Sequence, residues 1–183
     1  MVLQMSRQQF VINCIDYRYD DLISQYFNAI GENSNYYNAT TAGACLPISY
    51  NNYCHKYKSG CTHSFKKTND VLKRGLYTNL SISQQLSDLN IIFLIDHQDC
   101  GAFKTFLPLS GYPMELGEDN QREKRIHKRA LLLAKSKLCK RIPNKIRLGL
   151  IDVNGSVAYL NSKTGEWKVE YTGPGTNPKG LWW

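Results

Sequence analysis

Short apolar runs alternate with stretches of helical periodicity along this chain. The runs are rich in β-branched and aromatic residues, and the third is apolar on both faces, which is typical of a buried parallel strand. The predicted strands are 10–14, 37–42, 90–96 and 146–153. Apolar spacings of three and four between them predict helices at 22–30, 72–89, 101–109 and 122–141. This alternation predicts a three-layer α/β fold, a mostly parallel β-sheet flanked by helices.

The C-terminal part of the sequence indicates a different arrangement. Two short runs, 157–160 and 167–171, are separated by polar residues and a glycine, which predicts a hairpin. The tail 172–183 holds two prolines, three glycines and the terminal pair Trp182-Trp183. We expect an extended tail whose tryptophans dock on this subunit or on a neighbour. The length of 183 residues predicts one domain, 1–183, with a polar insertion at 50–64.

The formal net charge of +8 is concentrated in one segment. Residues 122–141 contain nine lysines and arginines and one acid, whereas the charges of the remaining chain balance. Apolar spacing in this segment predicts an inward helix face made of Ile126, Ala130, Leu133, Ala134 and Leu138. A solvated outer face explains the charge, and contact with nucleic acid through 122–141 is the alternative, because clustered cations bind polyphosphates.

No segment predicts a membrane span or a secretory signal. The longest aliphatic and aromatic run, 91–95, is far shorter than the roughly 20 residues of a membrane helix. The first nine residues lack the apolar stretch of a signal peptide, so we expect a cytoplasmic protein. In a reducing compartment, the six cysteines are expected to be thiols or metal ligands. Cys45 and Cys139 are interpreted as packing residues.

Three potential metal ligands follow predicted strands. Cys14 ends the first strand, and His97 and Cys100 come just after the third, so all three are expected at one edge of a parallel sheet. Two cysteines and one histidine are a set that catalytic zinc uses, with the fourth position kept for water. Each residue also has a structural explanation, because buried cysteines are common and a histidine at a strand end often only forms a hydrogen bond.

Asp16 and Arg18 favour the catalytic interpretation of this set. In an extended segment, Cys14, Asp16 and Arg18 would point to the same side, so a bidentate pair could form beside the metal. The structural alternative is a surface ion pair that contributes only about 0 to 1 kcal/mol.

Two motifs of this chain resemble the signatures of the β-class carbonic anhydrases, Cys-x-Asp-x-Arg and His-x-x-Cys-Gly. They are Cys14-Ile15-Asp16-Tyr17-Arg18 and His97-Gln98-Asp99-Cys100-Gly101. Between them, the segment Thr41-Ala42-Gly43-Ala44 is similar to the Ala-Gly loop of that family. The resemblance covers 10–109 in its motifs and extends less specifically to 153.

The resemblance implies a β-carbonic anhydrase-like fold with a zinc site. Cys14, His97 and Cys100 would bind Zn²⁺. Asp16 would either pair with Arg18, which leaves a water on zinc, or ligate the metal and close the site.

The reaction implied by the resemblance is the reversible hydration of carbon dioxide to bicarbonate by zinc-bound hydroxide. Gly43 and Gly101 would lie near the substrate. The protein would be a homodimer or a larger homo-oligomer with its pocket near a subunit interface. Two alternatives stay open: hydrolysis of carbon disulfide or carbonyl sulfide at the same site, and a non-catalytic zinc protein that binds a partner through 122–141.

Some positions depart from the family pattern. Only nine residues precede Phe10, where the family carries a helical arm, so the dimer could be built differently. Tyr17 is bulkier than the small residue usual there, and Thr41 replaces polar or basic residues, so the pocket could be narrower or take another substrate.

The polar insertion holds a second group of potential ligands. It consists of Cys54, His55, Cys61 and His63. Its spacing matches no established zinc pattern, so a loop in which Cys54 and Cys61 oxidise in air is the first interpretation, and a structural zinc site is the alternative.

Overall fold

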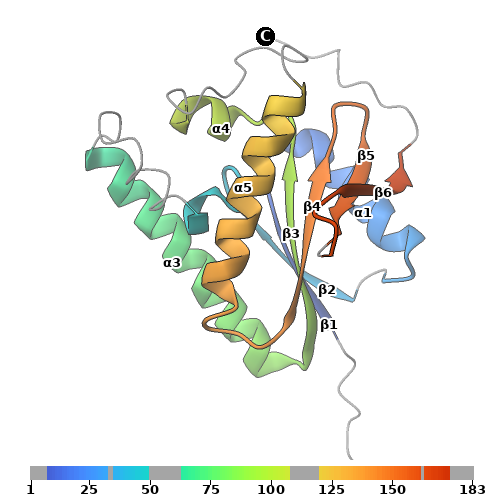
Figure 1. The fold of residues 1–183 in the computed structure, drawn as a ribbon. Coiled ribbons are helices and arrows are strands. Elements are labelled where there is room, and N and C mark those ends of the chain that lie inside the picture. The colour runs from blue at the N-terminus through green and yellow to red at the C-terminus, as the bar shows by residue number, and fades with distance from the viewer. Residues whose placement is uncertain (1–7, 33–34, 50–62, 108–119, 162, 174–183) are drawn as a thin grey trace, which may run out of the picture.

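The computed structural model describes residues 8–32, 35–49, 63–107, 120–161 and 163–173. Six strands form one sheet in the order β2-β1-β3-β4-β5-β6 (Figure 1). They are β1 Gln8–Asn13, β2 Tyr36–Thr40, β3 Leu89–His97, β4 Lys145–Ile151, β5 Ser156–Leu160 and β6 Trp167–Thr172. β1 is parallel to β2 and β3, β3 is parallel to β4, and the β4–β5 and β5–β6 pairs are antiparallel. The predicted mostly parallel sheet and the C-terminal hairpin are confirmed.

Helices cover both faces of this sheet, as the alternating pattern predicts. α3, α4 and α5 lie on one face, and α1 lies on the other (Figure 1). The helical elements are η1 Tyr17–Tyr19, α1 Asp20–Ala29, α3 His63–Leu86, α4 Gly101–Phe106 and α5 Asn120–Leu138. The three-layer α/β architecture is therefore confirmed.

The central strand β3 divides the hydrophobic core into two clusters. Ile92 and Leu94 point to the face covered by α3, α4 and α5, whereas Phe93 and Ile95 pack with residues of α1. Successive side chains of a strand point to opposite faces, so a run that is apolar throughout must be buried on both. This is the buried parallel strand that the sequence predicts, and its carboxyl end carries His97.

Several element boundaries differ from the predicted ones. α3 begins at His63, inside the predicted insertion 50–64, and α5 ends at Leu138. β4 ends at Ile151 because the Asp152 side chain accepts hydrogen bonds from the backbone N–H groups of residues 154 and 156, which forms a turn. β2 ends at Thr40, and the chain then turns through Gly43 at φ +70°.

The inward face of α5 differs from the predicted one. Ile126 and Leu133 are only partly buried, while Glu123 and His127 are buried. The apolar pattern could not predict this, because both polar side chains have hydrogen-bonding partners in the interior. Cys139 is exposed, so its interpretation as a packing residue is wrong, whereas Cys45 is buried.

Two predicted features lie outside the described residues. They are three members of the second group of potential ligands, Cys54, His55 and Cys61, and the tail with Trp182-Trp183; the fourth member, His63, begins α3, and both features stay predictions. None of the described helices combines the length and the apolarity needed to cross a membrane.

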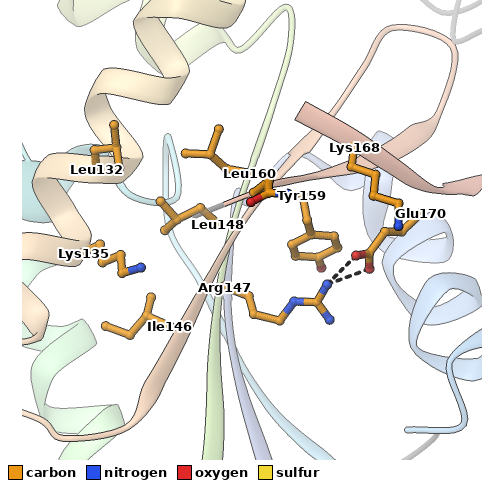
Figure 2. A pocket seen from close by; sticks show the side chains of 10 residues that line it. Leu132, Lys135, Ile146, Arg147, Leu148, Tyr159, Leu160, Lys168 and Glu170 are labelled. Carbon is orange, nitrogen blue, oxygen red and sulfur yellow. Dashed lines mark hydrogen bonds and ion pairs between the residues drawn. The ribbon is translucent and has the colours of Figure 1, made fainter. Parts of the chain in front are cut away.

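A cavity of about 460 Å³ opens between α5 and the β4–β6 end of the sheet (Figure 2). Its lining includes Arg147, Tyr159 and Glu170, and Arg147 Nη2 lies 2.6 and 2.7 Å from the two Glu170 carboxylate oxygens. None of the predicted site residues lines this cavity.

Candidate metal centre

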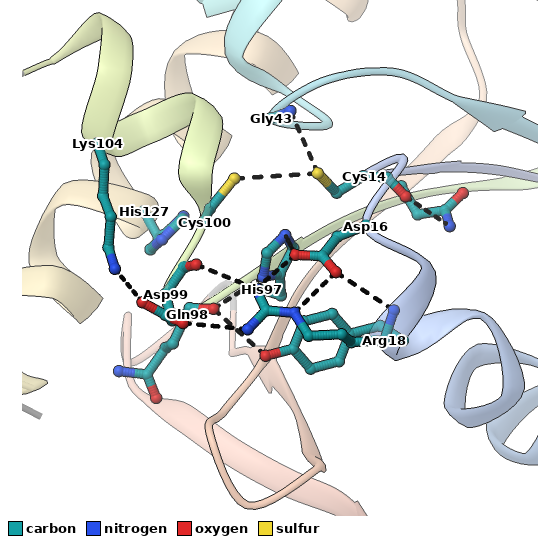
Figure 3. Close-up of polar contacts among 12 residues, drawn as sticks. Cys14, Asp16, Arg18, Gly43, His97, Gln98, Asp99, Cys100, Lys104 and His127 are labelled. Atoms are coloured by element: carbon teal, nitrogen blue, oxygen red, sulfur yellow. Dashed lines mark hydrogen bonds and ion pairs between the residues drawn. The ribbon is translucent and has the colours of Figure 1, made fainter. Parts of the chain in front are cut away.

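The three predicted ligands meet at the carboxyl edge of the parallel sheet. Asn13 pairs with Ile95 in adjacent parallel strands, so Cys14, just after β1, and His97, the last residue of β3, lie at the same edge. Cys100 is the residue that caps α4. The ligand atoms of Cys14, His97 and Cys100 all lie within 4.8 Å of one another, and all three residues are buried (Figure 3).

The histidine presents one nitrogen to this cluster. His97 Nδ1 lies 2.8 Å from the backbone carbonyl oxygen of Gln98. A carbonyl oxygen only accepts, so Nδ1 carries the proton and Nε2 has a free lone pair. Nε2 is buried and has no hydrogen-bond partner among the described residues. Buried polar atoms normally have partners, so this nitrogen beside two sulfur atoms fits a metal ligand.

The two cysteines form a coupled pair. Their sulfur atoms lie 3.9 Å apart. The hydrogen bond from Cys100 lowers the pKa of Cys14 to about 4, although burial opposes this effect. The same hydrogen bond, together with burial, raises the pKa of Cys100 well above its usual value. The pair alone therefore holds one thiolate, and a bound cation would stabilise the second.

The negatively charged groups around His97 favour a positive charge on Nε2, which can be a proton or a metal ion. Burial alone lowers the pKa of His97, but the neighbouring Cys14 sulfur and Asp16 carboxylate raise it more, so the net shift is upward. The ring is held in place by Tyr19, whose centroid lies 4.5 Å away.

Asp16 and Arg18 form the bidentate pair that the sequence predicts. Arg18 Nε and Nη2 lie 2.8 and 2.5 Å from the two carboxylate oxygens of Asp16. The local backbone differs from the expected extended segment, because Arg18 lies in the η1 turn, whose N-cap is Asp16. Burial raises the pKa of Asp16, but the hydrogen bonds from Arg18 lower it more, so the carboxylate is held ionised.

Asp16 also faces the candidate metal ligands. Its Oδ2 atom lies 3.7 Å from His97 Nε2. The carboxylate is thus paired with Arg18 and lies next to the ligand cluster (Figure 3).

The two glycines named from the sequence lie at different places. The Gly43 N–H donates to Cys14 Sγ at 3.3 Å, so this residue contacts a ligand directly. A Cβ atom at Gly43 would lie 3.0 Å from Leu46 Cβ and 3.1 Å from Ala102 Cβ. Gly101 is exposed at the start of α4, with open space where a Cβ would be.

Four residues that the sequence did not single out support the site. Asp99 accepts a hydrogen bond from Arg18 Nη1 at 3.1 Å and also pairs with Lys104. The Glu123 and Gln98 side chains bond to each other behind the loop that carries His97 and Cys100. A sequence signal existed for Glu123, which is the single acid in the basic segment 122–141.

No protein-family model matches the chain, and no curated protein matches it significantly. Among solved structures, the chain is similar to the β-carbonic anhydrase CcaA, with a TM-score of 0.58 and 12% identity over 96% of this chain and 83% of that one. The chain has the β-carbonic anhydrase fold.

Two further carbonic anhydrase structures are more distant. A structure from a study of two tetrameric β-carbonic anhydrases of the filamentous ascomycete Sordaria macrospora has a TM-score of 0.46 and 11% identity, over 86% of this chain and 82% of that one. The carbonic anhydrase of Streptococcus mutans has a TM-score of 0.42 and 17% identity, over 84% of this chain and 81% of that one.

Proposed function

We propose that this chain is a zinc-dependent carbonic anhydrase that interconverts carbon dioxide and bicarbonate. The observation that carries the proposal is the meeting of Cys14, His97 and Cys100 beside the paired Asp16 and Arg18. A purely structural zinc site would not need an ionised carboxylate held next to its ligands. The fold shared with CcaA supports the same conclusion.

The donor set fits zinc. Thiolates and imidazole suit zinc, and three protein ligands leave one coordination position for the reaction. Cys14, His97 and Cys100 would hold the metal, because the buried His97 Nε2 has no hydrogen-bond partner among the described residues. Zinc, when bound, supplies the Lewis acidity that lets a water molecule react near neutral pH.

The residues of the chain would orient the reacting water and protect the site. Arg18 keeps Asp16 ionised, so its carboxylate can accept a hydrogen bond from that water and orient it toward carbon dioxide. The Gly43 N–H stabilises negative charge on the Cys14 sulfur. We propose that the substrate binds beside Gly101, where a Cβ atom would meet open space, and that Gly43 lies at the edge of this binding position.

We also propose a homodimer or larger homo-oligomer. Ile15 and Tyr17 flank Asp16 and are 61% and 64% exposed. Large apolar side chains exposed beside a site are typical of surfaces that a partner subunit covers. A reducing compartment such as the cytoplasm would keep Cys14 and Cys100 available to the metal.

The test is stopped-flow hydration of carbon dioxide at about pH 8.5, where hydroxide is available to a zinc enzyme. Zinc content is measured in the same sample. Activity with zinc bound supports the proposal, and Asp16→Ala should lose that activity while it retains zinc. Bound zinc without activity would contradict carbon dioxide hydration and leave a site closed by Asp16, another substrate such as carbonyl sulfide or carbon disulfide, or a non-catalytic zinc protein. A wild-type protein that binds no zinc would overturn the ligand assignment.

A further inference from the structure

A buried carboxylate of α5 holds the loop that carries two of the three ligands. Glu123 Oε1 accepts the backbone N–H of Asp99 at 2.5 Å. Glu123 Oε2 accepts the side-chain N–H of Gln98 at 3.0 Å. Glu123 is only 4% exposed, although the segment around it is strongly basic. One side chain therefore fixes both residues between His97 and Cys100.

The loop needs such a partner because of its backbone. Asp99 has φ +57°, a left-handed conformation that non-glycine residues seldom adopt. Its N–H points into the protein interior, where it would lose its partner if Glu123 were absent. The conformation of Asp99 determines where the next residue, Cys100, places its sulfur.

A second side chain, one helical turn along α5, holds the other end of the same segment. His127 is fully buried, and its Nδ1 lies 3.0 Å from Asp96 Oδ2. Asp96 immediately precedes His97, and its other oxygen accepts the Cys45 N–H at 3.2 Å. The residue before each ligand is thus bound to α5: Asp96 by His127, and Asp99 by Glu123.

We propose that Glu123 and His127 are positioning residues that set the geometry of His97 and Cys100 and, through it, the affinity for metal. Neither side chain is placed among the ligands. This inference rests on the zinc site proposed above and adds that α5 determines its shape. Hydrogen bonds behind metal ligands commonly change metal affinity by about 10- to 100-fold.

The first test replaces Glu123 by glutamine, which has nearly the same shape. The two donors contact different oxygens of Glu123, and glutamine replaces one of these oxygens by an NH₂ group that cannot accept, so one of the two hydrogen bonds is lost. We expect Glu123→Gln to raise the zinc dissociation constant about tenfold, measured by competition with a chelator. The visible spectrum of the cobalt(II)-substituted variant should shift, because that spectrum reports ligand geometry. Faster hydrogen exchange of the Asp99 amide in the metal-free variant is a readout that needs no metal.

The second test uses His127, with a conservative variant as rescue. His127→Phe removes the bond to Asp96 and should weaken zinc binding. His127→Asn can place an amide N–H near the position of Nδ1 and should restore most of the affinity. Leu131→Ala is the matched control, because Leu131 is fully buried in the same helix. It should lower stability but leave the zinc affinity and the cobalt spectrum unchanged.

The outcomes separate this inference from the proposed function. The positioning role would be overturned if Glu123→Gln had the same zinc affinity, cobalt spectrum and Asp99 hydrogen exchange as the wild type. The proposed function would then still stand. If Leu131→Ala lowered the zinc affinity as much as Glu123→Gln and His127→Phe do, the loss would reflect general destabilisation. That result would also overturn the positioning role. A wild-type protein that binds neither zinc nor cobalt would overturn both proposals.

Discussion

Asp99 Oδ2 lies 3.1 Å from Arg18 Nη1, so the guanidinium of Arg18 is shared between two carboxylates. The other carboxylate belongs to Asp16. Asp99 also accepts a hydrogen bond from Lys104, which adds a second positive charge beside the two carboxylates. Arg18 therefore links the loop of β3 to the loop of β1, and the position of Asp16 depends on both.

Arg18→Ala should strongly reduce the proposed catalysis while zinc remains bound. Asp16 would lose both side-chain hydrogen bonds from Arg18 and keep only the one from the Arg18 backbone N–H, and it already lies 3.7 Å from His97 Nε2, so it could turn onto the proposed metal. We expect the rate of carbon dioxide hydration to fall by about 100-fold or more, the usual effect of removing one oriented electrostatic group. Stopped-flow rates and zinc content, measured on the same samples, test this.

Arg147→Ala is the control for that substitution. Arg147 also pairs with a carboxylate, that of Glu170, but it lines the cavity at the other end of the sheet (Figure 2). The Arg147→Ala variant should therefore retain the rate of carbon dioxide hydration. Equal losses in both variants would mean that any broken arginine pair impairs the protein, and the specific role of Arg18 would be wrong.

Gly31 and Gly43 have similar backbone conformations but different surroundings, so alanine substitutions there distinguish backbone strain from steric clash. Gly31 has φ +77°, and a Cβ atom placed there would have open space within 4 Å, whereas Gly43 has φ +70° and three close side-chain atoms. Gly31→Ala should cost about 1 kcal/mol, from backbone strain alone. Gly43→Ala should cost about 2 to 4 kcal/mol, because a clash is added.

Denaturant unfolding of the metal-free forms measures both costs. Gly43→Ala keeps the backbone N–H but should also weaken zinc binding, because the clash would displace that N–H from Cys14 Sγ. Equal destabilisation by the two substitutions would contradict the close packing around Gly43.

The layers of this fold could be predicted because they follow from patterns of apolar residues. The run 90–96 is apolar on both faces, and its residues 92–96 are buried in β3. Cys14 and His97 could be brought together from sequence for a related reason, since the carboxyl ends of adjacent parallel strands must meet.

The supporting residues could not be predicted in the same way. Glu123 and His127 are polar residues on a basic helix, and hydropathy places them in solvent. Their burial depends on partners contributed by β3 and the loop that follows it. Asp99 adopts a left-handed conformation that no local sequence signal marks. Such interactions depend on tertiary structure, which a pattern along one chain does not contain.

Alkaline pH should destabilise the protein through Tyr159. Burial raises the pKa of this tyrosine well above its usual value, so the folded state holds it neutral. The stability it contributes is complete below the unfolded pKa of about 10 and is lost as the pH rises above that value. The free energy of unfolding, measured from about pH 9 to 11, should therefore fall more steeply for wild type than for Tyr159→Phe. Parallel curves would contradict this role.

Removal of zinc should destabilise the native state by an amount that depends on the zinc concentration. A ligand that binds only the folded protein stabilises it by about 2.7 kcal/mol at 100 times its dissociation constant. We expect a chelator to lower the unfolding midpoint and added zinc to restore it, with a reductant present to prevent oxidation of the sulfur pair 3.9 Å apart. Cys14→Ser should lose this response. If zinc still stabilised Cys14→Ser to the wild-type extent, the metal would be bound elsewhere in the chain, and the cluster of Cys54, His55 and Cys61 would be the next site to test.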